Sequence, residues 1–352
     1  MIIHPNMELE DILSEDKPLS CSQMYSIAEH LFKLGRKKDA VPFFRYVVNH
    51  EQECDHEQFI MSQYRLFLAL IGIGAEENKE ALLRFESYYN QLPEHVRLDA
   101  ILQMANVYYT FWDWDKVESY ADELHTLAKK RYDQKLENDH FEDGQTERHL
   151  VVYYGQGFLL KGIALTMQGK YEEAKPYVKE YSDLGWFELL DETGRKEVEK
   201  FRIWGKGNMY TLELMTGNKN VLHDFAKFLD EHPEYTLPYL LSIMEAANKF
   251  NLLIDEIIER FCQRIPPLNS SISYINGTQL FHYWYEKTIY SFNNGKIGDG
   301  INELLYALYL SRKMQYYSGF ERCITLFEDH DEYATEQQMR EYKNILNGVS
   351  EQ

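Results

Sequence analysis

A six-residue segment, Gly169-Lys170-Tyr171-Glu172-Glu173-Ala174, restricts the fold more than any other part of the sequence. Its glycine is suited to end one helix, the aromatic residue two positions later opens the next helix, and the small alanine lets the two helices approach closely. The same arrangement occurs near the N-terminus, where Gly35 is followed by Ala40 and Phe44. A repeated glycine turn between apolar helices predicts a chain built from helix–turn–helix units.

Weaker copies of this unit extend over most of the chain. They are centred on Leu68 to Pro93, Met104 to Leu124, Met209 to Pro233 and Trp284 to Ala307. In the second of these copies, Trp112 stands where the turn glycine is usually found. Residues 237–265 predict one more pair of short helices around Lys249-Phe250-Asn251, and 332–346 predict an amphipathic helix that caps the last repeat.

The repeated unit resembles the tetratricopeptide repeat superfamily over residues 21–346. The strongest matches are Gly35 with Ala40 and Phe44, and Gly169 with Tyr171 and Ala174. No strand-like alternation persists in the sequence. The fold expected from this resemblance is all-α: a tetratricopeptide-like right-handed α-solenoid of about six or seven helix pairs with a C-terminal capping helix.

Composition shifts predict four regions along the chain. Residues 1–19 are a polar lead-in, 20–130 hold the N-terminal repeats, and 149–352 hold the C-terminal repeats and the cap. Between them, 131–148 have almost no apolar periodicity and predict an acidic loop or extended helix ends. Residues 268–277, rich in Ser and Asn after two prolines, predict a second loop.

The formal net charge of −20 restricts the partners of this chain. A surface this acidic repels phosphate backbones, so we expect no direct binding of nucleic acid. The four cysteines, Cys21, Cys54, Cys262 and Cys323, are far apart and are expected to be reduced residues rather than a disulfide framework. With no signal-like N-terminus and no apolar run long enough to span a bilayer, the sequence predicts a cytoplasmic protein that does not enter the membrane.

Known catalytic motifs are missing from the sequence. It contains no HExxH, GxSxG or P-loop pattern, and Gly295-Lys296-Ile297-Gly298-Asp299-Gly300 fits a repeat turn better than a phosphate loop. Asp139, His140, Glu142 and Asp143 are grouped in the acidic segment without the spacing of a metal site. We therefore expect a protein that is not an enzyme, with no catalytic residues, no metal site and no cofactor.

The predicted binding surface is the concave face of the solenoid, which the first helix of each repeat lines. Asparagine side chains on such a wall can hold an extended peptide backbone without regard to its sequence, and aromatic neighbours make pockets for its side chains. The candidate peptide-binding residues are Asn106, Tyr109, Gln156, Asn208, Thr211, Tyr285 and Asn293.

Long, irregular, aromatic-rich repeats in an acidic chain also resemble the peptide-receptor portion of Gram-positive quorum-sensing regulators (the Rap, NprR and PlcR group), without their N-terminal helix-turn-helix. The resemblance implies a cytoplasmic regulator that binds a short peptide or peptide segment in its groove through residues such as Asn106 and Asn208, with output through a regulatory protein partner. The alternative is a structural scaffold without a peptide ligand, assembling for example as a homodimer through its C-terminal helix.

Overall fold

The computed structural model describes residues 19–72, 74–138, 144–267 and 274–348, and within these ranges every regular element is a helix. The prediction of an all-α fold is confirmed. The α-helices are α2 (Cys21–Lys33), α3 (Lys37–Asn49), α4 (His56–Leu70), α5 (Ala75–Glu86), α6 (Glu94–Thr110), α7 (Trp114–Glu137), α8 (Leu150–Met167), α9 (Tyr171–Ser182), α10 (Glu192–Met215), α11 (Leu222–Glu231), α12 (Thr236–Phe250), α13 (Asp255–Phe261), α14 (Tyr274–Asn293), α15 (Ile297–Lys313), α16 (Tyr317–Glu328) and α17 (Glu336–Asn347). Short 3-10 turns at Glu51–Glu53, Tyr89–Gln91, Lys219–Val221, Pro233–Tyr235, Cys262–Arg264 and Asp331–Tyr333 connect several of them.

The turns between successive helices use a residue with a left-handed backbone, as the glycine pattern predicts. Gly35 has φ +78° between α2 and α3, and Gly169 has φ +77° between α8 and α9. Glycine adopts this conformation without steric cost. Between α6 and α7 the same place is taken by Trp112, with φ +60°, a conformation that is strained for a bulky side chain. Because such strain persists only where other contacts support it, we expect contacts of the Trp112 side chain to stabilise this turn.

Small and aromatic residues pack the helices as the repeat pattern predicts. Ala40, Phe44 and Ala174 have no exposed surface at all. Each helix from α2 to α11 contacts the helix that follows it. Further along the chain, α14 contacts α15 and α15 contacts α16. A chain whose neighbours in sequence are also neighbours in space builds an extended array rather than a single layered core.

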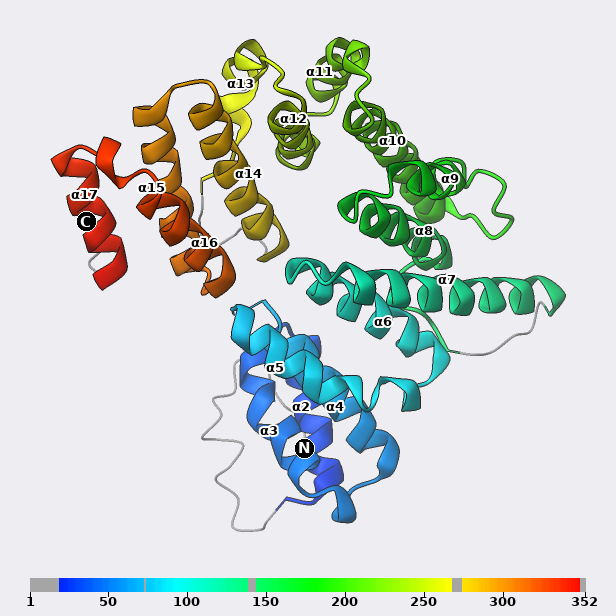
Figure 1. The fold of residues 1–352 in the computed structure, drawn as a ribbon. Coiled ribbons are helices and arrows are strands. Elements are labelled where there is room, and N and C mark those ends of the chain that lie inside the picture. Colours follow the sequence, from blue (N-terminus) through cyan, green and yellow to red (C-terminus); the bar gives the residue numbers. More distant parts are fainter. Residues whose placement is uncertain (1–18, 73, 139–143, 268–273, 349–352) are drawn as a thin grey trace.

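A contact between distant segments closes part of this array into a ring. Helix α6 contacts α8, α8 contacts α10, α10 contacts α12 and α12 contacts α14, and α14 in turn contacts α6. Figure 1 shows these five helices arranged around the centre of the molecule. The closure also brings Gly74, just before α5, beside Gln315 in the turn between α15 and α16, since a Cβ atom at position 74 would lie 2.9 Å from Oε1 of Gln315.

The predicted acidic segment 131–148 is helical in its first part. Helix α7 continues to Glu137 and packs against α8, which begins at Leu150. One hydrophobic cluster runs from Ile27 to Leu212 and so includes residues on both sides of the segment. Residues 139–143, with the grouping around His140, lie outside the described part of the chain, as do residues 1–18 of the predicted lead-in.

Near the C-terminus the structure differs from the sequence prediction in the extent of one loop and in the presence of one further helix, α16. The predicted loop at 268–277 is wrong from Tyr274 onward, because that residue opens α14, while 268–273 lie outside the described residues. The predicted capping helix is present as α17, whose buried Tyr342 and Ile345 face the cluster formed with α15 and α16. Helix α16 was not expected from the repeat pattern.

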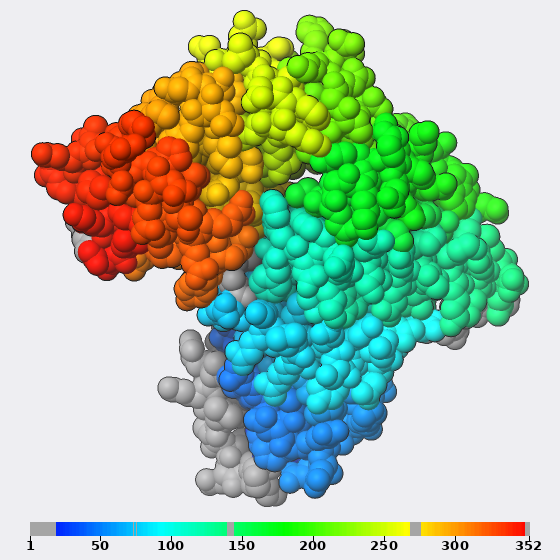
Figure 2. All heavy atoms as spheres, viewed as in Figure 1, coloured from blue at the N-terminus to red at the C-terminus, as the bar shows by residue number. Residues whose placement is uncertain are grey.

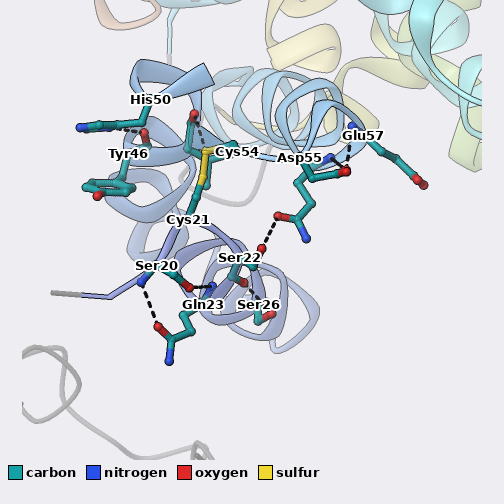
Figure 3. Close-up of a disulfide and its surroundings, with 12 residues drawn as sticks. Ser20, Cys21, Ser22, Gln23, Ser26, Tyr46, His50, Cys54, Asp55 and Glu57 are labelled. Atoms are coloured by element: carbon teal, nitrogen blue, oxygen red, sulfur yellow. Dashed lines mark hydrogen bonds between the residues drawn. A yellow bond between two sulfur atoms is a disulfide. The ribbon is translucent and has the colours of Figure 1, made fainter. Parts of the chain in front are cut away.

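Two of the four cysteines are joined in a disulfide, which contradicts the expectation of separate thiols. Cys21 lies at the start of α2 and Cys54 lies just before α4 (Figure 3). They are 33 residues apart in sequence, but the α2–α3 hairpin returns the chain on itself and brings their Cα atoms to 5.4 Å. Spacing in the sequence does not reveal such a pair. Cys262 is an exposed free thiol and Cys323 a buried one.

One helix in the described part of the chain, α8, is long and apolar enough to cross a membrane by length and composition alone. Two thirds of it (67%) is buried inside the protein, between α7, α9 and α10. Such burial is expected of a core helix, whose apolar residues face other helices on all sides. The apolar character of α8 is therefore accounted for by packing.

Candidate functional site

The ring of α6, α8, α10, α12 and α14 surrounds a cavity of about 280 Å³. Residues of all five helices line it, together with Trp112, Trp114, Val178 and Tyr235. Figure 2 shows the cyan, green, yellow and orange segments that carry them meeting around the centre of the molecule. A cavity of roughly 150 Å³ can already hold benzene, so this one has room for about two groups of that size.

Two contacts between α14 and the end of α6 close the ring at the cavity wall. The Nε2 atom of Gln279 donates a hydrogen bond of 3.2 Å to Oη of Tyr109. Beside it, the rings of Trp112 and His282 stack with their centroids 3.8 Å apart. The strained turn residue Trp112 therefore has a specific contact partner, on a helix from the other half of the chain.

His282 presents an imidazole without hydrogen-bond partners to this cavity. The residue is 1% exposed, and within the described part of the structure neither Nδ1 nor Nε2 has a hydrogen-bond partner. Burial, with a smaller effect of Arg322, lowers the pKa of His282 well below its usual value. The ring is therefore neutral, with one donor and one acceptor nitrogen. Leaving buried polar atoms unpaired is costly, and a bound ligand that pairs with them recovers that cost.

Glu245 on α12 places a carboxyl group in the same wall. The residue is half-buried and lines the cavity. Burial, followed by repulsion from Glu286 on α14, raises the pKa of Glu245 to about 8. Burial raises the pKa of Glu286 as well, although Nδ2 of Asn248 donates to its carboxylate at 2.8 Å. Two carboxyl groups from neighbouring helices thus lie close enough to repel each other when ionised, and one of them, Glu245, lines the cavity.

Helix α10 supplies the wall next to α12, and its Gly207 sets how closely α12 approaches. A Cβ atom at Gly207 would lie 2.3 Å from the ring of Tyr239, so only glycine leaves room for that ring against α10. Oη of Tyr239 donates to the backbone oxygen of Trp204 at 3.1 Å. Nδ2 of Asn208 donates to Oη of the fully buried Tyr181 at 2.6 Å, which fixes the orientation of the amide.

The structure brings together three of the seven predicted peptide-binding residues. Tyr109, Asn208 and Thr211 line the cavity. The cavity does not include the other four, because it spans only part of each helix. Asn106 is half-buried one turn before Tyr109, Gln156 is half-buried in the first half of α8, Tyr285 stacks on Phe281 beneath Arg322, and Asn293 is exposed at the end of α14.

The residues that give the cavity its chemistry, Glu245 and His282, were not among the predicted ones. A signal for the first exists in the sequence, because Glu245 is the one charged residue between Thr236 and Asn248. A lone carboxyl group in an otherwise apolar helix indicates a buried role. His282, between Phe281 and Tyr283, has no comparable signal, since its position depends on the contact between α6 and α14.

In the residues that the structure describes, no group of three or more His, Cys, Asp or Glu side chains is arranged to hold a metal ion. Comparison of the chain with protein-family models, curated proteins and solved structures found no match. The residues of the cavity and their geometry are therefore the basis on which a function is inferred.

Proposed function

We propose that this chain is a tetratricopeptide-like right-handed α-solenoid that binds a short peptide, or a segment of a protein, at the cavity inside its ring. Binding is then passed to a protein partner as a regulatory signal. The observation that carries the proposal is the buried, neutral imidazole of His282, unpartnered among the described residues, in the wall of a largely apolar cavity. Ligand sites typically combine apolar walls with a few polar groups of this kind.

The cavity fits the anchoring part of a peptide better than a whole extended peptide. Its volume of about 280 Å³ lies just below the usual range of ligand pockets, roughly 300–1,000 Å³. Aromatic walls from Tyr109, Trp204 and Tyr239 suit apolar side chains, and the amide oxygen of Asn208 and the hydroxyl of Thr211 supply hydrogen-bonding groups beside them. One or two side chains enter the ring in this proposal, and the rest of the peptide lies outside it.

The proposed regulation depends on the position of the ligand, which contacts the residues that join α6 to α14. The cavity wall includes Tyr109, Trp112, Gln279 and His282, which are the residues that join α6 to α14. A ligand that binds the closed ring more tightly than an open one shifts the population toward the closed form. That shift changes the relative position of helices that a partner protein can contact.

A synthetic random pentapeptide library tests the proposal. The protein is incubated with the library, separated by size exclusion, and retained peptides are identified by mass spectrometry. Ser242→Phe, which fills the cavity from its α12 wall, serves as the blocked variant, and Ser119→Phe, at an exposed position on α7, is its matched control. Peptides retained by the wild type and by Ser119→Phe but lost with Ser242→Phe support peptide binding in the ring. Retention by all three proteins, or by none, contradicts it.

We also propose a cytoplasmic location, which the resemblance to cytoplasmic peptide receptors supports. The disulfide between Cys21 and Cys54 favours the opposite, because disulfides are rare in reducing compartments. Alkylation of thiols in intact cells before lysis separates the two. Cys21 and Cys54 alkylated as free thiols support the cytoplasm, and a protected pair contradicts it.

A scaffold function remains the second candidate because of exposed aromatic residues near the C-terminus. Tyr317 is 56% exposed and Tyr333 is 58% exposed. Large aromatic side chains exposed on the surface are available for contact with another protein. A dimer mass in light scattering that becomes a monomer mass in the double variant Tyr317→Ser and Tyr333→Ser favours the scaffold, and a monomer mass for the wild type removes the homodimer.

A further inference from the structure

We propose that the ligand of the central cavity carries a positively charged amine or guanidinium group, which pairs with the carboxylate of Glu245 and lies against the aromatic wall. This inference rests on the proposed function, in that the cavity is taken as the ligand site. It adds the chemical class of the group that enters the ring: the amino terminus of a peptide, or the side chain of Lys or Arg.

The carboxyl group of Glu245 in the cavity wall favours a cationic ligand. Among the described residues that line the cavity, Glu245 is the one acidic side chain, it becomes mostly ionised above pH 8, and no Lys or Arg lines the cavity. No cation of the described chain stabilises the ionised form of Glu245, since burial and the charge of Glu286 are its two influences. A buried carboxylate without a counter-ion is unfavourable, and a cationic ligand supplies that counter-ion.

The neighbours of Glu245 on the other helices leave the positive charge to the ligand. From α6, Tyr109 contributes a phenol whose pKa is raised by burial and by Glu245 itself. From α14 come Glu286, the amide of Gln279 and the neutral imidazole of His282. Arg322 on α16 acts electrostatically on His282 and Glu286, but it is not a lining residue, and its guanidinium lies over the ring of Tyr285, 4.3 Å from the ring centroid.

Aromatic rings provide the second argument. The wall includes the indoles of Trp112, Trp114 and Trp204 and the phenols of Tyr109, Tyr235 and Tyr239. The face of an indole attracts cations, and this attraction grows when the cation leaves bulk water. An anionic ligand would be repelled by the ring faces and by the ionised carboxyl group of Glu245. A carboxyl group within an aromatic wall is therefore selective for cations over anions.

Proton release gives the inference a readout of its own. With the cavity empty, the pKa of Glu245 is about 8, so its carboxyl group is mostly protonated at pH 6.5. A cation binds best to the ionised form, and binding therefore expels the proton to solvent. Affinity should rise about tenfold per pH unit below pH 8, and it should level off above that pH.

The test uses three probes that share a phenethyl group: phenethylamine, phenethyl alcohol and 3-phenylpropionate. Binding is measured by isothermal titration calorimetry at pH 6.5 and 8.5, in buffers of different ionisation enthalpy. We expect the amine to bind at least tenfold more tightly than the alcohol, the propionate not to bind, and close to one proton to be released per amine at pH 6.5. Glu245→Gln should abolish the preference and the proton release, whereas Glu256→Gln, at an exposed position on α13, should keep both. Equal binding of amine and alcohol, or an unchanged preference in Glu245→Gln, overturns the inference.

The pentapeptide library separates failure of this inference from failure of the proposed function. Retained peptides that are enriched in Lys, Arg or a free amino terminus, and that are lost with Glu245→Gln, support both. Retained peptides without such enrichment leave peptide binding in place and overturn the cation. If no peptide is retained while phenethylamine binds through Glu245, peptide binding is wrong and the cation site stands.

Discussion

Trp112 and His282 stack at 3.8 Å although one belongs to the turn after α6 and the other to α14, in the opposite half of the chain. The backbone of Trp112 is in the left-handed region, which glycine adopts without steric cost. The indole of Trp112 explains why a bulky residue stands at this position. It joins α6 to α14 through the stack with His282, and it forms part of the cavity wall.

Replacing Trp112 by glycine tests whether this stack holds the ring together. Glycine suits φ +60°, so the turn itself is not strained by the change. Loss of an aromatic stack worth about 0.5–1.5 kcal/mol should speed amide hydrogen exchange in residues 278–282 of α14 by roughly two- to tenfold. Trp186→Ala, at a tryptophan that is 50% exposed and outside the cavity, is the control and should leave that exchange unchanged. Unchanged exchange in Trp112→Gly as well would show that the ring is held by other contacts.

The two asparagines that the quorum-sensing resemblance selects should behave differently. Asn208→Ala removes an amide that lines the cavity and leaves the buried hydroxyl of Tyr181 without its donor. We expect the affinity for a retained library peptide to fall about tenfold, as the loss of one hydrogen bond of about 1.4 kcal/mol would cause. Asn106→Ala changes a half-buried residue outside the cavity and should bind as the wild type does. Fluorescence anisotropy of a labelled peptide measures both, and an equal loss in the two variants would place the peptide elsewhere.

Glu245→Gln should stabilise the protein at high pH. The pKa of Glu245 is about 8 in the fold and near 4.5 without burial, so the folded protein keeps a proton that the unfolded chain has released. Wild-type stability therefore falls as pH rises from about 4.5 to 8, whereas glutamine has no such proton to lose. Melting temperatures should agree near pH 4, and the variant should melt higher by roughly 5–10 °C at pH 8.5. Glu256→Gln is the control, and a difference independent of pH would contradict the assignment.

Reduction of the disulfide should weaken the N-terminal helices and leave the ring intact. The bridge between Cys21 and Cys54 closes a loop with a sequence separation of 33 residues. Crosslinks of this loop length stabilise by about 3.7 kcal/mol, mainly by restricting the unfolded chain. The double variant Cys21→Ser and Cys54→Ser should show faster hydrogen exchange in α2 and α3 and unchanged exchange in α8 and α10. Equal protection of α2 and α3 in the variant and the oxidised wild type would show that the bridge contributes little.

The local parts of the fold could be predicted from the sequence. Gly35 and Gly169 mark turns in the structure, and Ala40 and Ala174 are fully buried between helices, because helix ends and close packing depend on nearby residues. Trp112 was also correctly placed in a turn. Such features depend on spacings of a few residues, which a single sequence displays directly.

The cavity could be predicted only in part, because its existence depends on the contact between α6 and α14. Tyr109, Asn208 and Thr211 follow from the expectation that first helices line a groove. His282 and Glu245 line the same cavity only because the array curls far enough for α6 and α14 to meet. How far an array of helices curls is the sum of many small rotations between neighbours, and no single residue reports that sum.

The contact between α6 and α14 also joins two groups of helices that extend away from the cavity. On one side of it lie α2 to α5, and on the other α15 to α17, with Gly74 and Gln315 touching where the two groups meet. A small rotation between α6 and α14 beside the proposed ligand would therefore become a larger displacement at the far ends of the two groups of helices. In this way, a ligand bound in the central cavity would change the surface that the outer helices present to a partner protein.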